Sequence, residues 1–194
     1  MQIATVVIPN LNGRKYLKDC LDSLREQSRQ DFSIVLIDNG SNDGSAGYVE
    51  AYYPEVEVVR FPDNQGFCRA VNEGILRSQT PYVILLNNDI ICDKAFVEEL
   101  VGAMEQEPRC FSCAAKMLQM HHPELMDNAG HYYSAFGWAF ALGKGKPAAR
   151  YNKKRAVFSA CAGAAIYRRS VFEKIGLFDE VHFAYLEDID VAYR

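Results

Sequence analysis

The first half of the chain alternates short apolar runs with segments in which apolar residues recur at helical spacing. The apolar runs predict strands over residues 3–8, 32–37, 56–61 and 82–86. The helical spacing predicts amphipathic helices over residues 16–24, 67–75 and 96–104, with a shorter helix near 45–53. Because strands and helices alternate, we expect an α/β fold with a Rossmann-like, mostly parallel sheet, right-handed crossovers and flanking helices.

The pattern loosens after Pro108. Two later apolar stretches predict strands, over residues 111–117 and 156–167. Between them, residues 144–155 carry six Lys or Arg residues and no acid, and we expect this run to form a mobile surface loop. The last residues, up to Arg194, look like the start of a helix. A natural domain seldom ends at such a point, so we expect a domain truncated at its C-terminus.

Composition narrows the class of protein. A chain of 194 residues is long enough for one domain with its own core, and 49% hydrophobic with 24% charged residues is typical of a globular protein. The net charge of −4 argues against a nucleic-acid partner, which requires a basic surface. No apolar run approaches the roughly 20 residues that span a bilayer. The first residues lack the basic start of a signal peptide and therefore predict a strand.

The cysteines indicate a reducing compartment. Six of them are scattered through mostly apolar segments, which suits the cytoplasm. Cys110 and Cys113 form a single CxxC pair, whereas a zinc site needs a second pair and a redox motif opens a helix after a strand. We therefore expect both to be buried thiols.

Polar residues follow each of the four predicted parallel strands. Because the carboxyl ends of parallel strands share one edge of the sheet, where open α/β sheets bind ligands, these residues describe a single site. Taken alone, each segment could also be only a turn or a helix cap, since Asn, Asp, Gly and Ser favour both. The residues in question are Pro9, Asn10 and Asn12; Asp38; Asn64 and Gly66; and Asn87, Asn88 and Asp89.

Asp89 is the candidate metal ligand. It stands just after the strand over 82–86, and a single carboxylate there can bind Mg²⁺ or Mn²⁺ whose shell is completed by phosphate oxygens. The alternative is that Asp89 caps the following helix. No GxGxxG follows the first strand and no GxxxxGK[ST] is present, which argues against a dehydrogenase and a P-loop ATPase.

The combination of motifs resembles the family 2 glycosyltransferases of the GT-A fold. It consists, in the expected order, of VVIPNLNG, IDNGSNDGS, NQGFCRAVNEGI and LLNNDI. The C-terminal segment SACAGAAIYRRSVFEKIGLFDEVHFAYLEDIDVAYR resembles the acceptor-side part of the bacterial rhamnosyltransferase-like branch. The resemblance implies one GT-A catalytic domain over 1–194, with a nucleotide-sugar-binding half over 1–107 and a mixed acceptor-side half over 108–194.

The resemblance also implies roles for individual residues. The first loop and the acid after the second strand would hold the donor base and ribose, which assigns Pro9, Asn10, Asn12 and Asp38. Further contacts with the nucleotide sugar are expected from Asn64, Gly66, Arg69, Asn72, Asn87 and Asn88. Asn87 takes the first acid position of the family's D-x-D motif, which leaves Asp89 as the metal ligand. The family's Glu-Asp pair falls on Glu187 and Asp188, with Asp188 as the general base and Glu187 as the next candidate.

These residue types fit an inverting transfer reaction. A metal would neutralise charge on the departing diphosphate, and a carboxylate would take the proton from the acceptor hydroxyl. The expected enzyme moves a sugar from a UDP- or dTDP-sugar to a saccharide or lipid-linked acceptor, in cell-surface polysaccharide synthesis. We expect it in the cytoplasm, with the inner face of the membrane as a second interpretation. The basic run over 144–155 could contact a lipid diphosphate or an anionic membrane, although a solvated loop is the simpler interpretation.

Other interpretations stay open at this point. Glu187 and Asp188 could be an acidic helix start, and Asp190 with Arg194 is expected to form an ordinary ion pair four residues apart. A sugar nucleotidyltransferase would need a Gly-rich basic loop after the first strand, and PNLNGRKYL has a single glycine. A non-catalytic nucleotide-sugar-binding module is the other alternative.

Overall fold

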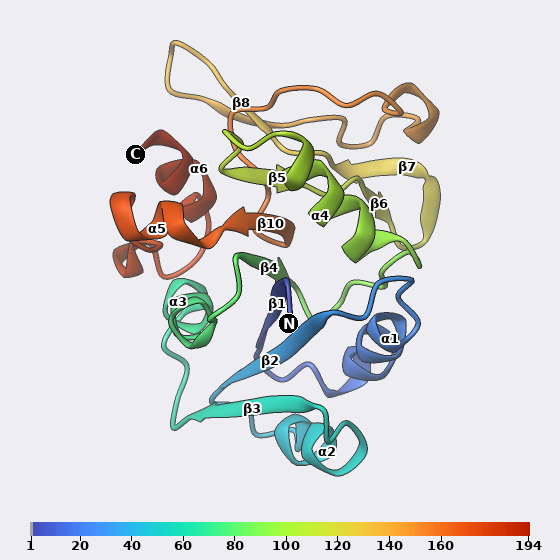
Figure 1. Cartoon of the computed structure of the whole chain (residues 1–194), viewed down its shortest axis with the longest axis vertical. Helices are drawn as coiled ribbons and strands as arrows, with labels where there is room; N and C mark the ends of the chain where they lie inside the picture. Colours follow the sequence, from blue (N-terminus) through green and yellow to red (C-terminus); the bar gives the residue numbers. More distant parts are fainter. Residues whose placement is uncertain (1) are drawn as a thin grey trace.

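The computed structural model describes residues 2–194 and shows a six-stranded sheet with helices on both faces (Figure 1). Strands and helices alternate through the first half, as β1 (Ala4–Asn10), α1 (Arg14–Arg25), β2 (Phe32–Asn39), α2 (Ser45–Tyr52), β3 (Val56–Phe61), α3 (Phe67–Arg77), β4 (Tyr82–Leu86) and α4 (Phe96–Gln106). The second half contributes β5 (Ser112–Ala114), β6 (Met117–Gln119), β7 (His122–Asn128), β8 (His131–Tyr133), β9 (Ala139–Ala141), β10 (Ala164–Arg168), α5 (Arg169–Ile175) and α6 (Glu187–Tyr193). Short 3-10 turns cover Ala148–Arg150 and Glu180–His182.

The strand order is β3-β2-β1-β4-β10-β5. The first four strands in this order are parallel, whereas β10 runs antiparallel to both β4 and β5. Strands β6 with β7, and β8 with β9, form separate two-stranded sheets beyond the β5 edge (Figure 1). The expected α/β fold, with a mostly parallel sheet and a mixed C-terminal part, is therefore confirmed.

Two apolar layers hold the helices against the sheet. On one face, Leu17 and Leu21 of α1 and Val97 of α4 pack against alternate residues of the strands, such as Val6 and Ile8. On the other face, α3, α5 and α6 pack against the intervening residues, among them Val7, Val35, Val83 and Leu85. Because successive side chains of a strand point to opposite faces, strands buried on both faces must be apolar throughout, as the sequence shows.

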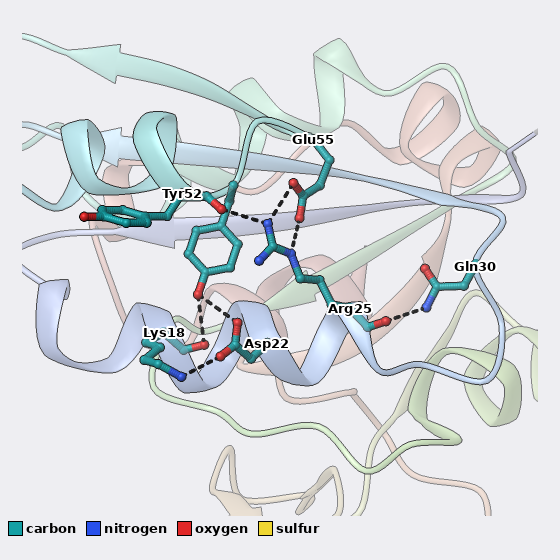
Figure 2. Close-up of polar contacts among 7 residues, drawn as sticks. Lys18, Asp22, Arg25, Gln30, Tyr52 and Glu55 are labelled. Atoms are coloured by element: carbon teal, nitrogen blue, oxygen red, sulfur yellow. Dashed lines mark hydrogen bonds and ion pairs between the residues drawn. The ribbon is translucent and has the colours of Figure 1, made fainter.

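A group of hydrogen bonds and ion pairs joins α1 to the end of α2 and the loop that follows it (Figure 2). Arg25 donates to both carboxylate oxygens of Glu55, at 2.6 and 3.0 Å, and to the carbonyl oxygen of Tyr52 at 2.8 Å. Asp22 accepts from Lys18 at 2.7 Å and from the hydroxyl of Tyr53 at 2.9 Å. The ion pairs are partly exposed and contribute little individually. The guanidinium of Arg25 also packs on the buried ring of Tyr53, which adds an apolar contact to these polar ones.

Two of the predicted strands are shorter than the sequence indicates. The stretch over 111–117 yields β5 only to Ala114, because the chain then leaves the edge of the main sheet to pair β6 with β7. The stretch over 156–167 forms a strand only from Ala164. Residues before it follow an irregular path, in which Ala160 and Ala162 are buried and Ser159 bridges to His131. A run of small apolar residues fits a packed loop as well as a strand, so its pattern does not distinguish them.

The basic run over 144–155 is anchored at its middle. Pro147 forms an isolated β-bridge with Leu125 of β7, and Ala148 is buried at the start of a 3-10 turn. The middle of the run is therefore packed, whereas its charged residues are exposed, as expected of a surface loop, and the mobility of the run stays a prediction. Cys110 and Cys113 are half-buried free thiols, and all six cysteines are unpaired.

In the part of the chain that the structure describes, every helix is too short or too polar to cross a bilayer.

Gly74 lies where α3 packs tightly against β1. A Cβ there would lie 2.2 Å from Cγ1 of the fully buried Val7. We expect Gly74→Ala to lower the free energy of unfolding by about 1–3 kcal/mol, because overpacking outweighs the gain in helix propensity. Gly102, in α4, is the matched control, since a Cβ there has no neighbour within 4 Å. Gly102→Ala should stabilise by roughly 0.5–1 kcal/mol. Urea unfolding of both variants measures the difference, and equal midpoints would contradict this packing.

Candidate active site

Asn10 is the centre of a hydrogen-bond network at the carboxyl edge of the sheet. It is the last residue of β1, lies opposite Asp38 in the register of β2, and is 1% exposed. Its side-chain NH₂ faces Asp38 Oδ1 at 3.0 Å, Ser45 Oγ at 2.9 Å and Ser41 Oγ at 3.1 Å. Its Oδ1 accepts from Asn88 Nδ2 at 2.7 Å. The network therefore joins the ends of β1, β2 and β4, as predicted from their polar endings.

The loops after β1 and β2 are joined by their own side chains. The backbone N–H of Asn12 donates to Ser41 Oγ, and Asn12 Oδ1 accepts from the backbone N–H of Asn42, both at 2.9 Å. Asp43 accepts from the N–H groups of Arg14 and Ser45. Sequence reasoning left Asp43 out, although its place in an SNDGS turn is the signal for such a role. Pro9, inside β1, is half-buried behind this network.

Gly13 is required for the approach of the β4 turn. A Cβ at this position would lie 2.0 Å from Asn88 Nδ2 and 2.4 Å from Asn10 Oδ1. The absence of a side chain therefore lets Asn88 reach Asn10. This contact brings the turn that carries Asp89 next to the loop of Asn10.

A second loop is held by Asn39, which sequence reasoning also missed. Its side chain donates to Asn64 Oδ1 and to the carbonyl oxygen of Gly66, both at 3.0 Å, and accepts from the N–H of Gln65 at 2.8 Å. Asn64 Oδ1 also accepts from the N–H of Gly66. Asn64 and Gly66 therefore lie together beside β2, and the buried Asn39 fixes their loop.

Arg69 and Asn72 are directed elsewhere. The amide of Asn72 is 3% exposed and pairs with both the N–H and the carbonyl oxygen of Phe178, at 3.0 and 2.8 Å. Arg69 forms an ion pair with Glu180 at 3.2 Å. Both side chains connect α3 to the segment before α6, and the structure does not bring them to the network around Asn10. The expected direct contact of Asn72 with a donor conflicts with this geometry, because its polar atoms are already paired and buried.

Asn87, Asn88 and Asp89 form the turn at the end of β4. The carboxylate of Asp89 is exposed and makes no hydrogen bond or ion pair within residues 2–194. Helix α4 starts later, and Asp93 binds the N–H of Ala95 at its beginning. The alternative role of Asp89 as the cap of this helix is therefore wrong. An unpaired carboxylate next to neutral Asn side chains fits a hard cation that takes its other ligands from a diphosphate.

Glu187 and Asp188 open α6 and are both buried, at 7% and 8% exposure. Burial raises the pKa of Glu187, and the neighbouring Asp188 raises it further. Burial likewise raises the pKa of Asp188, while His131 lowers it. Glu187 Oε2 has no hydrogen-bond partner in the described chain. Buried carboxylates with raised pKa values are typical of proton-transfer groups.

The loop over 160–163 places this acid pair beside the β4 turn. Asp188 Oδ2 accepts from the N–H of Ala162 at 3.4 Å, and the adjacent Gly163 carbonyl accepts from the N–H of Asn87 at 2.8 Å. A Cβ on Gly163 would lie 3.2 Å from Asn87 Nδ2. The proposed base and the turn that carries Asp89 are therefore two neighbours of one tight loop.

The segment over 183–186, which leads into α6, is exposed and has a strained backbone. Phe183, Tyr185 and Leu186 have positive φ values of 54°, 71° and 65°, which non-glycine residues seldom adopt, and their side chains are 52%, 86% and 60% exposed. The carbonyl oxygen of Phe183 accepts from the N–H groups of Phe67 and Cys68 at the start of α3. Within α6 the expected pair of Asp190 with Arg194 is confirmed at 2.8 Å. Arg194 also donates to the carbonyl oxygens of Ile175 and Leu177, which joins α6 to α5.

Comparison with known sequences gives one family and several bacterial relatives. The model of "Glycosyl transferase family 2" matches residues 5–176. The "Glycosyltransferase GlyG" of Streptococcus pneumoniae is 24% identical over 94% of this chain and 60% of its own length. The "N-acetylglucosaminyl-diphospho-decaprenol L-rhamnosyltransferase" of Mycobacterium tuberculosis is 24% identical over 99% of this chain and 70% of its own.

Solved structures share the fold. Residues 1–349 of S. aureus TarS superpose with a TM-score of 0.73 and 19% identity, over 99% of this chain and 55% of that one. Other TarS crystals contain UDP or UDP-GlcNAc. The mannosyltransferase PcManGT of Pyrobaculum calidifontis, in complex with GDP-Man and Mn²⁺, has a TM-score of 0.67 and 15% identity, over 91% of this chain and 47% of that one. The chain thus spans about half the length of these structures.

Proposed function

We propose, because this chain belongs to glycosyl transferase family 2, that it moves a sugar from a UDP- or dTDP-sugar to a hydroxyl group of a saccharide or lipid-linked acceptor. The reaction inverts the configuration at the anomeric carbon. One observation carries the proposal: the 160–163 loop holds a buried carboxylate, Asp188, next to the β4 turn that bears Asp89, whose carboxylate has no partner among residues 2–194. A proton acceptor and a ligand for a diphosphate-bound cation are the two groups that such a transfer needs.

The donor nucleotide lies along the edge of β1 and β2 in this proposal. Pro9, Asn10, Asn12 and Asp38 hold the base and ribose, and Asn64, Gly66, Asn87 and Asn88 face the rest of the donor. The crystals of TarS with UDP and UDP-GlcNAc support a uridine donor in the same fold. Arg69 and Asn72 act through the segment that leads to α6, which they fasten to α3.

Asp89 would hold Mg²⁺ or Mn²⁺ together with oxygens of the donor diphosphate. When bound, the cation supplies a Lewis acid that neutralises charge on the leaving diphosphate. The neighbouring Asn87 and Asn88 are neutral, so this chain offers the cation one carboxylate from the turn. The Mn²⁺ in PcManGT supports a divalent metal in a protein of this fold.

Asp188 takes the proton of the acceptor hydroxyl. As the O–H bond breaks, the hydroxyl oxygen forms a bond to the anomeric carbon, and the bond from that carbon to the diphosphate oxygen breaks with both electrons leaving on the diphosphate. A single base opposite the leaving group gives in-line displacement and hence inversion. Glu187, buried beside Asp188 with a raised pKa, is the second candidate.

Two observations support the proposed acceptor: the name of one relative and a basic segment of this chain. The M. tuberculosis relative is named for a diphospho-decaprenol acceptor, and we propose a saccharide or lipid-linked acceptor in cell-surface polysaccharide synthesis here. Residues 129–172 contain no Asp or Glu, and the basic run over 144–155 lies within them. This positive segment suits a lipid diphosphate or an anionic membrane surface in peripheral contact, on the cytoplasmic side.

Nucleotide binding tests the donor assignment. We expect Asp38→Ala to weaken the affinity for UDP or dTDP by roughly 1.5–3 kcal/mol, the range for a hydrogen bond to a charged group. Asp38→Asn keeps the acceptor atom that Asn10 needs and isolates the loss of the carboxylate. Asp19→Ala, an exposed acid on the far side of α1, is the control. Titration calorimetry measures all four proteins, and unchanged affinity in a folded Asp38→Ala protein would remove Asp38 from the site.

Two enzyme assays separate the alternatives. Donor hydrolysis or transfer, with release of the free nucleoside diphosphate, is expected of the glycosyltransferase and not of a non-catalytic binding module. Conversion of the nucleotide sugar and pyrophosphate to a nucleoside triphosphate would instead identify a sugar nucleotidyltransferase.

A further inference from the structure

The proposed base, Asp188, belongs to a cluster of three polar side chains. His131 at the start of β8, Cys161 in the loop before β10, and Asp188 bring their potential ligand atoms within 4.8 Å of one another. His131 is nearly buried, with a side-chain exposure of 14%. A nitrogen, a sulfur and an oxygen at such distances suggest either a metal site or a set of hydrogen bonds. The proton on the imidazole ring distinguishes the two.

The neighbours of His131 determine that proton. The N–H of Gly130 donates to Asn128 Oδ1 at 2.7 Å, which fixes the orientation of the Asn128 amide. Its NH₂ group then faces Nε2 of His131 at 3.1 Å. Because an amide NH₂ only donates, Nε2 must accept and the neutral ring must carry its proton on Nδ1.

A ring in this state does not bind a metal through Nδ1. Protonated Nδ1 has no lone pair to offer, and Nε2 is occupied by Asn128. Burial also raises the pKa of Cys161 to about 11, which keeps the sulfur as a thiol. The Nδ1 nitrogen is instead hydrogen-bonded to Ser159 Oγ at 3.1 Å, and Asp188 Oδ2 lies 3.5 Å from the same nitrogen, at ion-pair distance.

We propose that His131 is a positioning residue for Asp188: its ring, held by Asn128 and Ser159, presents the Nδ1–H edge 3.5 Å from Oδ2 of the carboxylate, which also accepts from the N–H of Ala162, and so leaves the other oxygen to take the acceptor proton. The inference rests on the proposed function, in which Asp188 is the base. His131 is suited to this task because its backbone is fixed as well. Its N–H donates to the carbonyl of Ser159, and its carbonyl accepts from Phe158, both at 2.8 Å.

His131 also affects the charge of the base. The titratable groups that face Asp188 are Glu187 on the same helix, Cys161, Tyr167 of β10 and His131. Among these four, His131 alone presents a ring N–H edge to the carboxylate, with Nδ1 3.5 Å from Oδ2. Its removal should therefore favour the protonated form of Asp188. The acidic limb of the rate profile should move to higher pH.

Two substitutions separate the two sides of the ring. Asn places an NH₂ at the position of Nδ1, whereas Gln places one at the position of Nε2. We expect His131→Gln to lower kcat roughly 10- to 100-fold with little change in KM for the donor, and to move the acidic limb to higher pH. His131→Asn should retain most of the parent rate. A merely structural role would make both variants fail alike or the asparagine variant fail more.

Long-range proton–nitrogen spectra of the whole ¹⁵N-labelled chain test the inference without activity. The chain has four histidines, and His131→Asn identifies the signals of His131. We expect a protonated Nδ1 and an unprotonated Nε2, with no response of these signals to added Zn²⁺. An Nε2–H ring, or a Zn²⁺-dependent shift that is lost in Cys161→Ser, would overturn the proposal.

The double variant distinguishes this inference from the proposed function. If His131 acts through Asp188, His131→Gln should have little further effect on transfer once Asp188→Asn is present. Slow transfer by Asp188→Asn with a normal rate for His131→Gln would refute the positioning role alone. Normal rates for both would refute Asp188 as the base, and with it this role.

Discussion

Asp188→Asn should lower the rate of sugar transfer by about 100-fold or more while leaving donor and metal binding nearly unchanged. The carboxamide keeps the shape of the side chain but cannot take the proton of the acceptor hydroxyl. Asp188 bonds to the 160–163 loop and faces His131, whereas the donor site proposed here lies along β1, β2 and the β4 turn. Initial rates of transfer and calorimetry with UDP or dTDP measure the two effects separately.

Asp190→Asn is the matched control for this prediction. It lies two residues along the same helix and forms a half-buried ion pair with Arg194, so its replacement by the isosteric Asn should cost little activity. Equal transfer rates for Asp188→Asn and its parent would show that Asp188 is not the base. Glu187→Gln would then be the next variant to measure.

The rate of sugar transfer should also increase with pH. Burial raises the pKa of Asp188, and a base acts only when it is unprotonated. The transfer rate should therefore increase as the pH rises through this elevated pKa, and the residual rate of Asp188→Asn should lack this limb of the profile.

Asp89→Ala should remove the effect of divalent metal on the protein. We expect Mn²⁺ or Mg²⁺ to strengthen the binding of UDP or dTDP relative to EDTA, and the variant to bind equally in both. Transfer should fall roughly 100-fold or more, since a cation on the diphosphate supplies several kcal/mol of transition-state stabilisation. The physical reason is that Asp89 is the carboxylate of the β4 turn and has no internal partner among residues 2–194.

Calorimetry in metal and in EDTA checks this assignment. Asp19→Ala, which removes an exposed acid outside the site, should keep the metal dependence of the parent. Equal affinity of the parent in metal and in EDTA would refute a metal at Asp89.

Several parts of the site were predictable because they depend on neighbouring residues in the sequence. The run YVILL gives β4 with the same bounds that the pattern predicts, since a short continuous apolar run between turns is stable as a strand buried on both faces. Once β1, β2 and β4 are parallel, their polar endings must meet at one edge. The meeting of Asn10, Asp38 and Asn88 follows from this.

Other parts depend on contacts between residues far apart along the chain. The resemblance implied a contact of Asn72 with the donor, but the amide of Asn72 binds Phe178, 106 positions away. The irregular path over 156–163 has no signal in its small apolar residues, because a packed loop and a strand bury them equally well.

The sequence by itself determined the alternation of strands and helices and the polar edge, because periodicity and turn chemistry are local properties, whereas the resemblance to a family singled out the acids at 187 and 188. Only the tertiary structure decided where β10 enters the sheet, and thereby that one loop joins Asp188 to the β4 turn. It alone decided that Asn128 and Ser159 hold the ring of His131 and that Nδ1 of this ring lies 3.5 Å from Oδ2 of Asp188. The direction of a side-chain hydrogen bond depends on partners that the fold brings together, and no spacing along the chain encodes it.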